Sequence, residues 1–172
     1  LFMLATNVIG CALVTIEFAR LFPLWHLGAW ATLTTLVAMV VAIRRLSSRT
    51  SADTTATLAD VRGTFVDGLA LGLVWAAAPL YFGMAGDAAA LLGLLAVVIV
   101  LMAAAAIAMA ALPLATLLFL FTLGASAAAA FVLLGLEAVG ASLALFTGLL
   151  MIGCFARGRA LVVIRAAEIA LA

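Results

Sequence analysis

The sequence predicts an all-α integral membrane protein, a bundle of about six transmembrane helices with both ends of the chain in the cytoplasm. Hydrophobic residues make up 70% of the 172 residues and charged residues only 9%, and the mean hydropathy is +1.46. A soluble domain is typically about 45–50% apolar and about 25% charged. Lipid, and not water, is therefore expected to cover most of the surface. The apolar runs and the arginine clusters then place the helices.

The first half of the chain contains two apolar runs followed by one long polar segment. The first run, residues 1–19, ends near Glu17 and Arg20. A short link leads to the second run, residues 27–43, which stops at two consecutive arginines. Each run approaches the roughly 20 apolar residues that a membrane-spanning helix needs. Residues 44–63 hold four arginines, two aspartates and seven serines and threonines, and we expect a loop outside the bilayer.

The second half is predicted to hold four further spans. No residue between 88 and 124 is charged, and this stretch is too long for one span and about right for two. Pro113 divides it, because proline suits the first turn of a helix and not its interior. Glu137 marks the turn before the last span. The predicted spans are residues 64–84, 88–110, 113–134 and 139–155, and residues 157–172 are predicted to begin a cytoplasmic connector helix.

The basic residues, all of them arginines, predict the orientation of the bundle. Arginine accumulates in short loops on the cytoplasmic side of a membrane. Residues 44–63 and 157–172 are both rich in arginine, so both are expected in the cytoplasm. This requires an even number of spans between them, and the prediction gives four. The side chains expected to determine the topology are Arg44, Arg45, Arg49, Arg62, Arg157 and Arg159.

Two ionisable residues near the opposite membrane face are candidates for sensing, because a charged group in a bilayer is costly. Glu17 lies three residues before Arg20, on the same helical face. An interfacial ion pair is the expected role, and a proton- or cation-sensing carboxylate is the alternative. His26, the only histidine, stands between Trp25 and Trp30. We expect a tolerated interfacial histidine there, with a pH sensor as the alternative.

The third predicted span contains a proline. Pro79 removes the backbone hydrogen bond to the carbonyl of Trp75 and should kink the helix. The kink either lines a binding cavity or is a feature of packing, and the sequence favours neither. Trp75, Tyr81 and Phe82 are the side chains that would line such a cavity, although core packing is expected for each of them.

The cytoplasmic start of this span carries a carboxylate and two glycines. Asp67 is expected to interact favourably with the positive N-terminus of the helix. Gly68 and Gly72 form a GxxxG pair, a pattern that lets helices approach closely in lipid. We expect the pair to pack within the bundle in preference to forming a dimer.

Patterns for catalysis, cofactors and nucleic acid are not found in the sequence. It contains no Walker loop, no GxSxG, no zinc motif and no paired carboxylates, and Cys11 and Cys154 lie in apolar runs as small hydrophobic residues. No basic stripe interleaved with aromatics suggests nucleic-acid binding. This segment is therefore predicted not to be an enzyme and to bind no cofactor or metal. Its expected partners are membrane lipids and a second copy of the chain or a larger membrane assembly.

Four stretches resemble a family of sensory domains. They are TNVIGCALVTIEF, LFPLWHLGAW, FVDGLALGLVWAAAPLYF and LPLATLLFLF. Together they are similar to the N-terminal MASE-type membrane domains of bacterial GGDEF and EAL signalling proteins, and the resemblance covers nearly the whole chain. It implies a sensory input domain in the bacterial inner membrane that regulates an attached cyclic di-GMP cyclase or phosphodiesterase. That module would follow the last helix, since no GGDEF or EAL signature lies in these residues.

Two other functions stay open at this point. A small structural or accessory subunit of a larger membrane complex is the alternative, held in place by helix packing. A transporter or channel comes third, because the paired short or interrupted spans that indicate a secondary transporter are not found.

Overall fold

The computed structural model describes residues 2–50, 58–108 and 113–171, and in these ranges every regular element is helical. Side chains are described for residues 3–46, 61–107 and 114–160. The prediction of an all-α fold with six helices is confirmed. The helices are α1 (Phe2–Phe18), α2 (Leu24–Thr50), α3 (Leu58–Ala77), α4 (Ala88–Ala108), α5 (Pro113–Leu133) and α6 (Glu137–Leu171), and a π turn, η1 (Ala78–Phe82), and a 3-10 turn, η2 (Gly83–Ala85), follow α3.

Five helices in the described residues are long and apolar enough to cross a membrane. α1 is also apolar but has 17 residues. The predicted six spans thus correspond to five candidate spans and one shorter apolar helix. The candidate spans are Leu24–Leu46, Val61–Ala85, Ala88–Ile107, Leu114–Leu133 and Glu137–Ala160.

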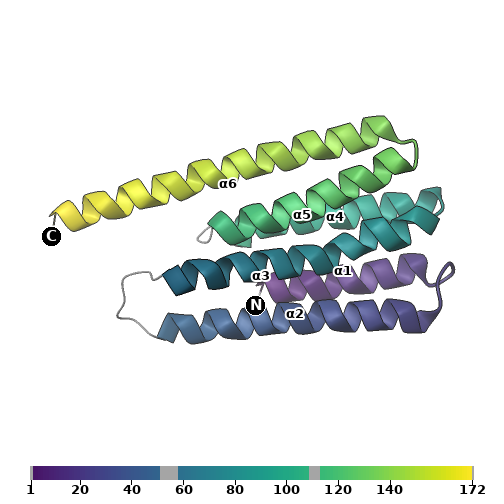
Figure 1. Cartoon of the computed structure of the whole chain (residues 1–172), viewed down its shortest axis with the longest axis horizontal. Coiled ribbons are helices and arrows are strands. Elements are labelled where there is room, and N and C mark those ends of the chain that lie inside the picture. The colour runs from purple at the N-terminus through teal and green to yellow at the C-terminus, as the bar shows by residue number, and fades with distance from the viewer. Residues whose placement is uncertain (1, 51–57, 109–112, 172) are drawn as a thin grey trace.

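The helices lie side by side along the long axis of the molecule, and α6 extends past the others (Figure 1). α4 and α5 hold the bundle together, because α4 contacts α1, α5 and α6, and α5 contacts α3, α4 and α6. The end that holds the α1–α2 link and the turn before α4 is called the aromatic end, after Trp25 and Tyr81. The opposite end, where α2 ends and α3 begins, is called the arginine end, after Arg44 and Arg62.

At the arginine end the structure differs from the predicted loop at residues 44–63. α2 continues past Ile43 to Thr50, and α3 begins at Leu58 and not at residue 64. Charged side chains end an apolar span, but they do not end a helix, because arginine is a good helix former and residues 44–50 contain no glycine or proline. Part of the predicted loop, residues 51–57, lies outside the described residues.

The turn between α5 and α6 follows directly from one glycine. Gly135 has φ +77°, a left-handed conformation that glycine adopts without steric cost. The N–H of Leu136 donates to the carbonyl of Phe131 at 2.9 Å, and that of Gly135 donates to Val132 at 3.0 Å. These bonds form a Schellman motif that ends α5. Glu137 then begins α6 with an acidic side chain in its first turn, where it complements the helix dipole.

The orientation predicted from the arginines can be tested by cysteine-accessibility labelling. Cysteines placed at positions 87 and 137 should label from outside the cell, and a cysteine at position 53 should label only from the cytoplasm, because the arginine-rich segments favour that side. The native thiols of Cys11 and Cys154 are buried, so the unmodified protein is the matched control and should label weakly. Labelling of positions 53 and 87 from the same side would contradict this topology.

Candidate functional site

A buried polar contact joins α1 to α3. Asn7 and Trp75 are both fully buried. The indole N–H of Trp75 donates to Oδ1 of Asn7 at 2.6 Å, and Nδ2 of Asn7 donates to the carbonyl of Met3 at 2.7 Å. Gly10 lets the indole lie against α1, since a Cβ there would be 2.9 Å from the ring. The contact therefore satisfies two polar side chains that would be costly to leave unpaired in a low-dielectric interior.

A second tryptophan extends this contact to α2. The indole N–H of Trp30 donates to the carbonyl of Val74 at 3.0 Å. Its ring stands perpendicular to that of Trp75, with 5.2 Å between centroids and 88° between planes, an edge-to-face geometry that aromatic pairs favour. We call Asn7, Trp30 and Trp75 the tryptophan core. It ties three helices together through directional contacts.

A cluster of rings, the aromatic rim, covers the tryptophan core at the aromatic end. It consists of Phe22, Trp25, His26, Tyr81 and Phe82. Phe22 lies 5.6 Å from Tyr81 and 5.1 Å from Phe82, measured between ring centroids. Phe82 is buried and lies 5.5 Å from the ring of Trp30 in the core, whereas Trp25 and Tyr81 are 70% and 53% exposed. The rim thus connects the exposed rings of Trp25 and Tyr81 to the tryptophan core through ring contacts.

Three of the predicted site residues divide between these two clusters. Trp75 belongs to the tryptophan core, which agrees with the core-packing interpretation. His26 and Tyr81 lie together in the rim, 6.4 Å apart between centroids. Trp75 and Tyr81 do not share a cavity in the described residues, because Trp75 is fully buried and Tyr81 faces outward.

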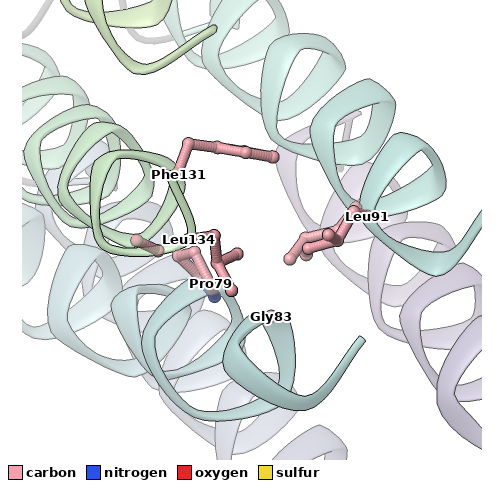
Figure 2. Close-up of a pocket in the computed structure, with 7 residues that line it drawn as sticks. Pro79, Gly83, Leu91, Phe131 and Leu134 are labelled. Atoms are coloured by element: carbon pink, nitrogen blue, oxygen red, sulfur yellow. The ribbon is translucent and has the colours of Figure 1, made fainter. Parts of the chain in front are cut away.

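Pro79 interrupts the α-helical pattern as expected. The helix adapts through the π turn, in which the N–H of Gly83 bonds to the carbonyl of Ala78. A shallow apolar recess lies beside the proline. Figure 2 shows side chains from α4 and α5 around it, and it has no room for a water-sized molecule. The recess is therefore a packing feature; its lining residues are Pro79, Gly83, Leu91, Leu94, Ala130, Phe131 and Leu134.

Glu17 does not form the expected ion pair. α1 ends at Phe18, so Arg20 lies beyond the helix and the spacing of three residues no longer places the two side chains on one face. In the described part of the chain no salt bridge joins Glu17 to Arg20; the carboxylate of Glu17 instead lies over Gly93 of α4, where a Cβ would be 2.9 Å from its Cδ. The glycine provides the space for this carboxylate.

Asp67 also has a different partner from the one expected. Because α3 begins at Leu58, Asp67 is well inside the helix and does not interact with its N-terminus. Its carboxylate is buried and accepts a bond from the guanidinium of Arg44 on α2 at 2.8 Å. One of the predicted topology arginines therefore also fixes α2 to α3. Of the others, Arg62, Arg157 and Arg159 are exposed, Arg45 is partly buried, and the side chain of Arg49 lies outside the described residues.

Sequence reasoning missed Asn7 as the partner of Trp75. A signal for it exists, because an asparagine inside an apolar run of a membrane helix needs a hydrogen-bond partner within the bundle. The sequence cannot say which residue that is, since the two side chains are 68 positions apart. The same holds for Arg44 and Asp67, which are 23 positions apart.

The described residues show no grouping of three or more His, Cys, Asp or Glu side chains that could hold a metal ion. No family model, curated protein or solved structure matches the chain. By helix length and hydropathy the chain is a multi-pass membrane protein.

Proposed function

We propose that this chain is a sensory input domain of the bacterial cytoplasmic membrane, which passes the state of its helix bundle through α6 to an attached cytoplasmic module. The continuity of α6 carries the proposal. α6 runs for 35 residues without a break from Glu137 to Leu171, whereas its apolar span ends at Ala160. At 1.5 Å per residue it is about 50 Å long. A single helix of this length can move a segment outside the bilayer when its membrane part shifts.

The packing supports a mechanical connection from α1 to α6. The tryptophan core joins α1 to α3. α3 then lies directly against α5 at Gly68, which faces the backbone of Ala115. α5 lies against α6 at Gly124, where the side chain of Thr147 fills the space of a missing Cβ. Rigid, closely packed elements of this kind carry energetic coupling between distant sites. A change near the tryptophan core can therefore displace α6.

In this proposal the attached module belongs to the cyclase or phosphodiesterase class that makes or degrades cyclic di-GMP. The similarity of the four sequence stretches to MASE-type domains supports this class. In this proposal the chain catalyses no reaction and acts by shifting the populations of two states of the bundle. Such a shift requires a stimulus that interacts differently with the two states.

Output of a fused cyclase tests the proposal. The whole chain is joined to a diguanylate cyclase catalytic domain, and cyclic di-GMP is measured in membranes. Asn7→Leu leaves the indole N–H of Trp75 without an acceptor and should change the output by about two-fold or more, since coupling between sites is commonly of this size or larger. Val8→Leu is the matched control, because Val8 is the next residue and faces outward.

Equal output from the wild-type chain, Asn7→Leu and Val8→Leu, at equal amounts of protein in the membrane, would contradict the sensory role. It would favour the alternative, a structural or accessory membrane subunit whose bundle only anchors what is attached to it.

A further inference from the structure

We propose that His26 is a proton-binding site that switches the aromatic rim between two arrangements, so that acidification at the aromatic end is the stimulus of the domain. The inference rests on the proposed function, because it names the signal that the sensory domain receives. It stands on the geometry of His26, which differs from that of an ordinary interfacial histidine. Its ring contacts two other rings, and one of its nitrogens is buried without a hydrogen-bond partner among the described residues.

The ring of His26 contacts two other rings. It stacks on Trp25 with 3.5 Å between centroids and 30° between planes. Its other neighbour is Tyr81 of η1, at 6.4 Å and 66°. Nδ1 of His26 is buried and has no hydrogen-bond partner among the described residues. The pocket therefore accepts an uncharged ring and offers no acceptor for a second ring N–H.

The charged groups at this end do not compensate a positive charge on His26. The hydroxyl of Tyr81 is the titratable group on the ring that faces it. Glu17 lies over Gly93 of α4, and Asp87 accepts a bond from the N–H of Ala90 at 2.8 Å. Arg20, in the link before α2, and Glu137, at the start of α6, are exposed. No carboxylate in the described residues forms a salt bridge with His26.

Protonation is expected to drive the ring out of this pocket. Histidine is the side chain whose charge ordinarily changes between about pH 5 and pH 8. A positive charge would gain a cation–π interaction with Trp25. However, it would also enclose a charged N–H that has no acceptor, and it would lie in the first turn of α2, where the helix dipole repels a cation. A buried charged N–H without an acceptor costs more than a cation–π contact with an exposed ring such as Trp25 contributes, so we expect the charged ring to turn toward water.

This movement reaches the tryptophan core through rings already in contact. When the imidazole leaves, Tyr81 loses one of its neighbours. Tyr81 and Phe82 are adjacent in the π turn and lie 5.2 Å apart between centroids, and Phe82 lies against Trp30. A change in the packing of η1 thus changes the packing of the core that joins α1, α2 and α3.

Spin-label distances test the switch. Cysteines are introduced at Gly28 of α2, where a Cβ meets open space, and at Met84 of η2, which is exposed. The native buried thiols are retained, and the protein without added cysteines measures their background labelling. The whole chain is placed in lipid nanodiscs, and the distance between the two labels is measured at about pH 8 and about pH 5, the range in which histidine titrates.

We expect the distance distribution to shift between the two pH values in the otherwise wild-type chain. It should not shift in His26→Gln, which is uncharged at both, or in His26→Phe, which keeps a ring in the pocket. An unchanged distribution in the His26 chain, or an equal shift in both variants, would overturn the proposal. Two different substitutions keep the test decisive if one of them folds poorly.

The fused cyclase separates this inference from the proposed function. If output responds to Asn7→Leu but not to pH, and the distance does not shift, the switch is wrong and the sensory role stands. If the distance shifts with pH only when His26 is present, while cyclase output responds neither to pH nor to Asn7→Leu, the switch stands and the sensory role is wrong.

Discussion

Replacement of Gly68 by alanine is expected to destabilise the bundle by about 2–3 kcal/mol, in the upper part of the range for overpacked sites. A Cβ at this position would lie 2.5 Å from the carbonyl oxygen of Ala115 and 2.7 Å from its Cα. Both are backbone atoms, so no side-chain rotation relieves the collision, and α3 and α5 must separate. Alanine favours a helix over glycine by about 1 kcal/mol, which offsets only part of this cost.

Reversible unfolding in mixed micelles measures the effect, and Gly148→Ala is the matched control. No atom lies within 4 Å of a Cβ built at Gly148, so the same substitution there should be neutral or stabilise the protein by up to about 1 kcal/mol. Equal destabilisation by the two substitutions would mean that Gly68 does not form a close contact.

Gly72 provides a second comparison on the same helix pair. A Cβ there collides first with the hydroxyl of Thr122, which is a side-chain atom. Thr122→Ala removes the hydroxyl but keeps the Cβ of residue 122, which would lie 2.9 Å from the added atom. It should therefore recover part of the stability lost in Gly72→Ala, whereas it should recover none of the loss in Gly68→Ala. This contrast separates a side-chain collision from a backbone collision.

The second large effect is expected at the ion pair between α2 and α3, and it should be asymmetric. The side chain of Asp67 is 9% exposed, and that of Arg44 is 52% exposed. Arg44→Ala leaves a buried carboxylate without its partner and should cost about 2–3 kcal/mol. Asp67→Ala leaves a guanidinium that can turn to solvent and should cost less than about 1 kcal/mol. The double variant should resemble Asp67→Ala.

Arg62→Ala is the matched control for this pair. Arg62 is exposed at the same end of the bundle, so its replacement removes the same charge near the membrane without exposing a buried partner. Its effect should stay within about 0.5 kcal/mol, as for most surface positions. If the Arg44→Ala and Arg62→Ala variants unfold at the same concentration of denaturing detergent, the Arg44–Asp67 ion pair makes no net contribution to the stability of the bundle.

Much of the fold could be predicted from the sequence, because an apolar run long enough to cross a membrane can adopt few structures other than a membrane-spanning helix. Pro113 begins α5 as expected, and Gly68 and Gly72 lie inside the bundle against α5. The ends of α2 and α3 were less predictable. Arg44 and Arg62 indicate where lipid ends, but the backbone hydrogen bonds of a helix continue into water.

The candidate site could be predicted only in part. Lipid is as apolar as the interior of a bundle, so hydropathy does not tell the inner face of these helices from the outer one. Trp75 and Tyr81, only six positions apart, show this, since one is fully buried and the other faces outward. Asn7 takes its importance from a contact between α1 and α3 that no local pattern contains.

The distance between α6 and the rest of the bundle tests whether a change in the tryptophan core displaces α6. Labels at Val61 of α3 and Ala160 of α6, both exposed and both toward the arginine end, report the position of α6 relative to the bundle in nanodiscs. We predict that Asn7→Leu shifts the distance between these labels and that Val8→Leu leaves it unchanged. Identical distributions in the wild-type chain and both variants, with all three proteins folded, would show that α6 does not respond to the tryptophan core.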